Sequence, residues 1–221
     1  MPADVPEDFD EASHAAEPRA PLLAALLQPR AVLGTVASKP RLGPALAAVL
    51  LTGVVSLVLD SLAALWQQSG LSAALVLSLC LPVLFLLFWL LSAWLISAGA
   101  MIMGAEDRRQ HYLAVSGHTF PALIPYAAIT ALQSAALRWG GGAGPTINDA
   151  AGWLTLAVLV WFLVLTVLAI QAVYSLSNLS ALSLALFPYA VLSGAVLLLI
   201  VAVSVLHGVG LASAIVRVMV A

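Results

Sequence analysis

The most constraining feature of this chain is a run of 33 residues, Leu71 to Met103, that contains no charged side chain and one proline, Pro82. The hydrocarbon core of a bilayer needs about 20 helical residues, and uncharged apolar runs of about 18 or more are typical of membrane-spanning helices. We therefore expect this run to cross a membrane. Its surplus length would be taken up by tilt or by a bend at the proline.

The composition extends this expectation to the whole chain. Of 221 residues, 63% are hydrophobic and only 8% are charged, whereas soluble domains carry about 25% charged residues. Such a chain has too little polar surface for a soluble globule, so we expect one integral membrane domain in contact with the lipid bilayer. The eight Lys and Arg residues are spread thinly, which argues against nucleic-acid binding. Cys80 is the only cysteine, which excludes an intrachain disulfide.

The N-terminal part divides into two segments. Residues 1–20 are predicted to be a disordered acidic tail, because the first 17 contain six Asp and Glu and no Lys or Arg. Such a segment lacks the basic start of a secretory signal peptide. Residues 21–43 contain two short apolar pieces separated by Pro29. We predict that they form a broken amphipathic element in the headgroup region, anchored by Arg30, Lys39 and Arg41.

Residues 44–207 are predicted to form an all-α bundle of five membrane spans. Each span is an apolar run of about 20 residues, and charged or turn-forming residues separate it from the next. The predicted spans are residues 44–66, 71–103, 118–137, 148–174 and 184–207. An uncharged linker, 175–183, precedes the fifth span, and residues 208–221 are predicted to be a short external tail.

The basic residues predict the orientation of these spans. Two basic residues, Arg138 and Arg217, fall on one face of the membrane. Six fall on the other, before the first span or after the second: Arg19, Arg30, Lys39, Arg41, Arg108 and Arg109. Cytoplasmic loops carry an excess of Lys and Arg, so we expect a cytoplasmic N-terminus and an external C-terminus.

Asp60 lies inside the first apolar span, where an ionisable group is costly and marks a candidate for function. At 1.5 Å of rise per residue it lies close to the outer end of its span. We expect it to face the interface or to pair with Arg138, which closes the third span. Ion or substrate handling by Asp60 is the alternative.

Other polar side chains lie in or beside the third and fourth spans, and such groups commonly form hydrogen bonds between helices. They are Gln133, Gln171, Tyr174 and Asn178. In a transporter or channel component, Asp60, Gln133 and Gln171 would form the polar lining. Small residues recur along the second span, and they permit either a compact bundle or a homo-oligomer.

Two constellations with catalytic or metal-binding residue types carry little weight. Ser204 and His207 share a helix face and would complete a triad with Asp60, but no Gly-x-Ser-x-Gly elbow is present, and the glycines after His207 are typical of a helix end. The segment 106–111 matches no metal-ligand spacing. We expect no metal and no cofactor. We expect the segment 106–111 to form a solvated loop that is a candidate for binding a protein partner. Its charged or titratable residues are Glu106, Asp107, Arg108, Arg109 and His111.

The order of these features resembles the Yip domain family, the Ypt/Rab-interacting membrane proteins and their prokaryotic relatives. The resemblance covers residues 22–207. It rests on the LLQPR stretch at residues 26–30, KPRLGP at 39–44, a tight hairpin, a polar loop and three further spans. Two local features add to it, namely HTFPALIPY at 118–126, and Trp161 followed by a Ser-rich linker and ALS at 181–183.

Eukaryotic members of this family carry an Asp-Leu-x-Gly-Pro motif before the first span, where this chain has Arg41-Leu42-Gly43-Pro44. The resemblance is therefore closer to the prokaryotic members. It implies a five-span, non-enzymatic protein of a prokaryotic cytoplasmic membrane that organises membranes or acts as a scaffold through protein partners at its cytoplasmic face. A small transporter or channel component is the alternative function, and an intramembrane enzyme ranks third.

Overall fold

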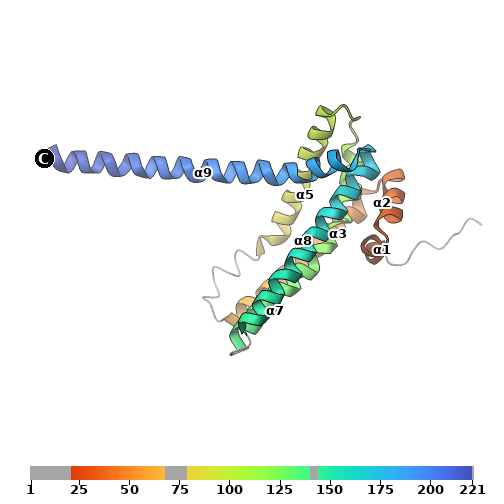
Figure 1. The fold of residues 1–221 in the computed structure, drawn as a ribbon, viewed down its shortest axis with the longest axis horizontal. Helices are drawn as coiled ribbons and strands as arrows, with labels where there is room; N and C mark the ends of the chain where they lie inside the picture. Colours follow the sequence, from red (N-terminus) through yellow and green to blue (C-terminus); the bar gives the residue numbers. More distant parts are fainter. Residues whose placement is uncertain (1–20, 68–78, 140–143, 221) are drawn as a thin grey trace, which may run out of the picture.

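In a computed structural model, described for residues 21–67, 79–139 and 144–220, the chain is helical throughout and contains no strand (Figure 1). Side chains are described for residues 24–63, 79–136 and 146–204. The predicted acidic tail and the first part of the central apolar run, up to residue 78, lie outside these ranges. The predicted all-α class is confirmed for the described residues.

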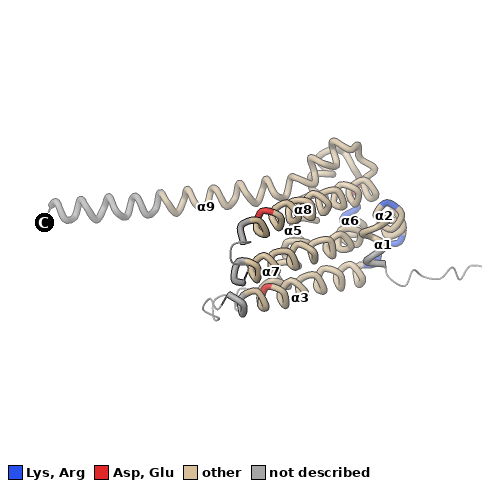
Figure 2. The backbone as a smooth tube through the Cα atoms, turned by 60° about the horizontal axis from the view of Figure 1, so that its bottom comes forward, with Lys and Arg blue, Asp and Glu red and all other residues tan. Residues whose placement is uncertain are grey.

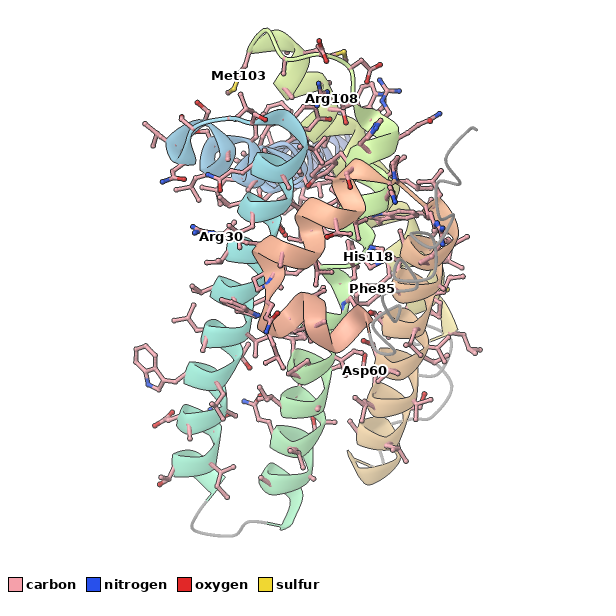
Figure 3. The ribbon with its side chains drawn as sticks, turned by 90° about the vertical axis from the view of Figure 1, so that its right-hand side faces the viewer. Arg30, Asp60, Phe85, Met103, Arg108 and His118 are labelled. Carbon is pink, nitrogen blue, oxygen red and sulfur yellow. The ribbon has the colours of Figure 1, made fainter. Side chains whose placement is uncertain are left out.

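The helices follow one another with short connections. In chain order they are α1 (Pro21–Leu27), α2 (Pro29–Ser38), α3 (Leu42–Gln67), α5 (Leu81–Ile102), α6 (Arg109–Gly117), the 3-10 turn η2 (Phe120–Leu123), α7 (Ile124–Trp139), α8 (Gly144–Tyr174) and α9 (Asn178–Val220). Figures 1 and 3 show α3, α7 and α8 side by side, with α1 and α2 lying across them.

Four of the described helices are long and apolar enough to cross a membrane. They contain the stretches Leu42–Ala63, Leu81–Ile102, Thr146–Tyr174 and Asn178–Ser204. At most 33% of the best window of any of them is buried inside the protein. Most of their apolar surface therefore needs lipid, and by length and composition the chain is a multi-pass helical membrane protein. These stretches overlap the predicted first, second, fourth and fifth spans.

The predicted third span, residues 118–137, is not one continuous α-helix. It begins in the turn η2 and continues in α7, which has 16 residues, fewer than the roughly 20 that cross a bilayer. The cause is the pair Pro121 and Pro125, which fall in the first turns of η2 and α7. A proline has no N–H to donate to the preceding turn, so it starts a helix and does not continue one.

Other boundaries also differ from the prediction. Pro82 lies in the first turn of α5, where its missing N–H costs little, and does not bend a longer described helix. The linker before α9 is only three residues long. Ser175 ends α8 in a left-handed conformation with φ 52°, and the Ser180 N–H donates to Ser177 Oγ at 3.3 Å, which caps α9.

Helix α9 is 43 residues long, or about 64 Å, roughly twice the thickness of a hydrocarbon core. It includes residues 208–220, predicted to be a tail after a helix end at His207. The glycines at 208 and 210 cost only about 1 kcal/mol each in a helix, which an otherwise apolar helix tolerates. Among its described side chains, to residue 204, the buried ones lie in the first turns, and the later part of the helix projects from the bundle (Figure 1).

Candidate functional site

The charged side chains separate the two ends of the bundle. Figure 2 shows the described Lys and Arg residues at the end where α1, α2 and α6 lie, and acidic residues towards the far ends of α3 and α8. The basic residues are Arg30, Lys39, Arg41, Arg108 and Arg109, and the distant acidic residues are Asp60 and Asp149. We call the first end the basic end. It contains the predicted headgroup segment and the predicted partner-binding loop.

The loop between α5 and α6 is held by its own charged residues. Gly104, at φ 85°, follows the end of α5, and Arg108 then pairs with Glu106 through Nη2 at 2.8 Å and Nε at 3.2 Å. Arg108 Nη1 also donates to the Val173 carbonyl in the last turn of α8 at 3.4 Å. An arginine satisfies such C-terminal carbonyls and complements the helix dipole.

Most of the loop's remaining polar groups are used locally or face solvent, but Arg109 Nε is buried and has no hydrogen-bond partner among the described residues. The Arg109 N–H donates to Asp107 Oδ1 at 3.2 Å, at the start of α6. His111 is half-buried on α6, and Glu106 and Asp107 are exposed. Nowhere in the described ranges do three or more His, Cys, Asp or Glu side chains gather in a way that would hold a metal ion.

A groove opens at the basic end where α1 breaks from α2. The groove is shallow and open on one side, and its volume is about 480 Å³. The residues that line it are Gln28, Pro29, Arg30 and Ala31 from the break, and Trp161, Val164 and Leu168 from α8. Sequence reasoning assigned Arg30 to the headgroup region but missed its neighbours on α8. That helix is apolar on all sides, so its sequence does not reveal which face meets α2.

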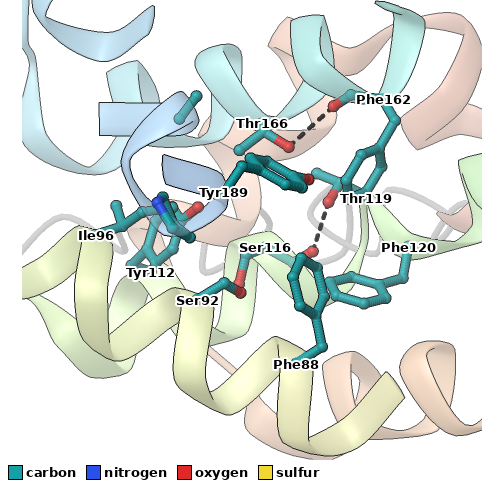
Figure 4. Close-up of a pocket in the computed structure, with 12 residues that line it drawn as sticks. Phe88, Ser92, Ile96, Tyr112, Ser116, Thr119, Phe120, Phe162, Thr166 and Tyr189 are labelled. Carbon is teal, nitrogen blue, oxygen red and sulfur yellow. Dashed lines mark hydrogen bonds between the residues drawn. The ribbon is translucent and has the colours of Figure 1, made fainter. Parts of the chain in front are cut away.

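A second, smaller cavity lies among α5, α6, η2, α8 and α9 (Figure 4). Its volume is about 20 Å³, which is room for about one water molecule. Hydroxyl groups line it, among them those of Thr119 and Thr166, which donate to the Ser116 carbonyl at 2.8 Å and the Phe162 carbonyl at 2.9 Å. The rest of its lining is mainly aromatic and aliphatic, and the cavity is too small for an organic substrate.

Buried hydrogen bonds connect α5 to its neighbours. The Tyr174 hydroxyl of α8 donates to Ser97 Oγ of α5 at 2.9 Å, and Ser97 donates to the Ala93 carbonyl at 2.7 Å. Trp89 Nε1 of α5 donates to Ser116 Oγ of α6 at 3.0 Å. Each bond satisfies polar groups that water and lipid do not reach, so they fix how these helices pack.

The predicted polar residues do not converge. Gln133 of α7 donates to Asn148 of α8, and Gln171 of α8 donates to Asn178 of α9. Both pairs join neighbouring helices, as expected of interhelical hydrogen bonds. Asn148 and Gln171 are 23 positions apart on α8, or about 35 Å. The two pairs therefore lie at opposite ends of the bundle and line no common path.

Asp60 is half-buried on α3, towards the end opposite the basic residues (Figure 3). Arg138 lies in the last turn of the neighbouring helix α7, but its side chain is outside the described set, so their pairing stays a prediction. Ser204 is exposed and lies in the second half of α9, a helix that projects from the bundle (Figure 1). The side chain of His207 is not described. The structure thus does not bring Ser204 to Asp60.

Comparisons with known proteins assign this chain to no group. No protein-family model, no curated protein and no solved structure matches it. The resemblance to the Yip domain family therefore stays a prediction. A function has to be inferred mainly from the geometry of the basic end.

Proposed function

We propose that this chain is a non-enzymatic, multi-pass membrane protein of the Yip type that acts as a membrane-organising scaffold through protein partners at its cytoplasmic, basic end. The observation that carries the proposal is the gathering of five Lys and Arg residues, those whose side chains are described, at one end of the bundle (Figure 2), whereas Arg138 lies in the last turn of α7. Among the described residues, the basic end carries these five cations against two acidic residues, Glu106 and Asp107, so its net charge is positive. Such a surface attracts and orients partners of the opposite sign. The partner's contacting surface is accordingly acidic.

The same asymmetry orients the protein, because cytoplasmic ends carry the excess of Lys and Arg. We place five crossings in a prokaryotic cytoplasmic membrane. The third crossing consists of α6, η2 and α7 together. A broken helix is tolerated at membrane depth where protein surrounds it, and α6 packs against α2, α3, α5 and α8. The N-terminus is then cytoplasmic and the C-terminus external.

Two features favour a scaffold over a transporter. The amide pairs lie at opposite ends of α8, whereas a transport site needs polar groups that converge near the bilayer midplane. The cavity among α5, α6, η2, α8 and α9 has room for about one water molecule. Neither feature supplies a path for a solute.

A site-specific photo-crosslinker tests the proposal in the native membrane. Gln110 is exposed in the first turn of α6 at the basic end, and Asp149 is exposed near the start of α8 at the other end. A crosslinker at position 110 should give a discrete protein adduct, and one at position 149, the matched control, should give none. Identical adduct patterns at the two positions, or lipid adducts alone, would reject a partner at the basic end.

A further inference from the structure

The groove at the α1–α2 break exists because of a local backbone feature. Gln28 leaves the helical conformation, with φ −132° and ψ 59°, and Pro29 restarts the chain as the first residue of α2. A proline at this position cannot continue the preceding helix, so α1 and α2 meet at an angle. Helix α8 forms one wall of the groove, because α2 packs directly on that helix.

The α8 side of the groove is an apolar stripe. Trp161, Val164 and Leu168 are spaced by three and four residues, which puts them on one helix face over about 10 Å. Trp161 is 41% exposed and Val164 is 39% exposed. Because α8 is a candidate span, this stripe runs along the direction in which lipid acyl chains lie.

The polar part of the groove is the guanidinium of Arg30. Arg30 is exposed and forms no ion pair with any described residue. Glu106, an acidic residue of the same end, is already paired with Arg108. Figure 3 shows Arg30 beside α8. A guanidinium binds a phosphate through two parallel hydrogen bonds, and its aliphatic stem packs on apolar surface. Gln28 adds an amide that can also donate.

We propose that this groove is a binding site for an anionic phospholipid, with one acyl chain against the α8 stripe and the headgroup phosphate on Arg30. A free anion would leave the stripe uncovered, and a neutral lipid would leave the charge of Arg30 uncompensated. The site goes beyond the scaffold function. Only its assignment to the cytoplasmic leaflet rests on the proposed orientation, so the lipid can bind even if no protein partner exists.

Native mass spectrometry of the purified full chain tests the headgroup contact. The detergent contains equal amounts of phosphatidylglycerol and phosphatidylcholine with the same acyl chains. The spectrum of the chain released from it shows which lipid stays bound. Wild type should retain phosphatidylglycerol preferentially. Arg30→Gln should lower its retention about fivefold, the effect of one basic residue near an anionic surface. It should lower the retention of phosphatidylcholine less, because the choline ammonium already neutralises that lipid's phosphate. Lys39→Gln removes the same charge from the same end outside the groove, and it should keep the preference.

A second pair of variants tests the apolar stripe. Val164→Trp fills the groove and should lower the retention of phosphatidylglycerol, whereas Val54→Trp, on the exposed surface of α3, should not. Thermal unfolding of each variant verifies that the bundle is intact. Equal retention of the two lipids by wild type would overturn the proposal. So would an equal loss in Arg30→Gln and Lys39→Gln, or unchanged retention in a folded Val164→Trp variant.

Discussion

At the scale of single residues, Gly117 determines how closely two helices approach. It ends α6, and a Cβ atom at this position would lie 2.6 Å from Ala45 Cβ and 2.8 Å from the Ala45 carbonyl oxygen of α3. Real Cβ contacts are not this short, and the clash includes backbone, which cannot rotate away. The neighbouring residue, Ser116, accepts the Trp89 hydrogen bond. The glycine therefore allows the packing that buries this bond.

We predict that Gly117→Ala lowers the free energy of unfolding by about 1–3 kcal/mol, the usual cost of overpacking a core. Gly152→Ala is the matched control, because no atom lies within 4 Å of its added Cβ on α8. It should leave stability unchanged or raise it by up to about 1 kcal/mol. Unfolding in detergent measures the free energy of both variants. Equal effects of the two substitutions would contradict the close approach of Gly117 to Ala45.

Sequence reasoning identified some of these residues and not others. The amides of Gln133 and Gln171 are recognisable as interhelical donors because a polar side chain in an apolar span needs a partner. The role of Gly117 is not recognisable, since it depends on which helix lies opposite. The same holds for the face of α8 beside Arg30.

At the scale of helices, the Tyr174–Ser97 hydrogen bond joins the last turn of α8 to the C-terminal part of α5. Tyr174 also contacts Tyr112 of α6, with ring centroids 6.0 Å apart. Three helices thus meet around one side chain. Their packing keeps the start of α9 and the α5–α6 loop together at the basic end.

A double-mutant cycle with Tyr174→Phe and Ser97→Ala should give a coupling energy of about 0.6 kcal/mol, the average for hydrogen bonds between membrane helices. Tyr174→Phe combined with Ser92→Ala is the control. Ser92 donates to the Trp89 carbonyl within its own helix at 3.0 Å, so these effects should add. Additivity in the first cycle would show that the bond contributes nothing.

The lengths of apolar runs predicted most helices because a bilayer sets a minimum length for a crossing. The predicted third span was wrong in one respect, because the structure divides it into the turn η2 and the short helix α7. The preceding helix, α6, is polar in sequence and buried by protein, so hydropathy does not detect it. The linker before α9 was predicted too long, because Ser177 is an N-cap and Asn178 already belongs to the helix.

At the scale of the whole molecule, the separation of charge and the directions of the helices support the same orientation. Helices α3 and α7 run away from the basic end, α5 and α8 return, and α9 leaves it again (Figures 1 and 2). An odd number of crossings places the two ends of this chain on opposite sides of the membrane. Four crossings, with α7 as a helix that does not cross, would place them on the same side.

Reporter fusions at Ala221 separate these two arrangements and test the central claim most directly. Alkaline phosphatase is active only outside the cytoplasm, and a green fluorescent protein exported in unfolded form does not fluoresce there. We predict an active phosphatase and no fluorescence at Ala221, and the reverse for control fusions after Gln110 at the basic end. Fluorescence with inactive phosphatase at Ala221 would contradict five crossings and the proposed orientation.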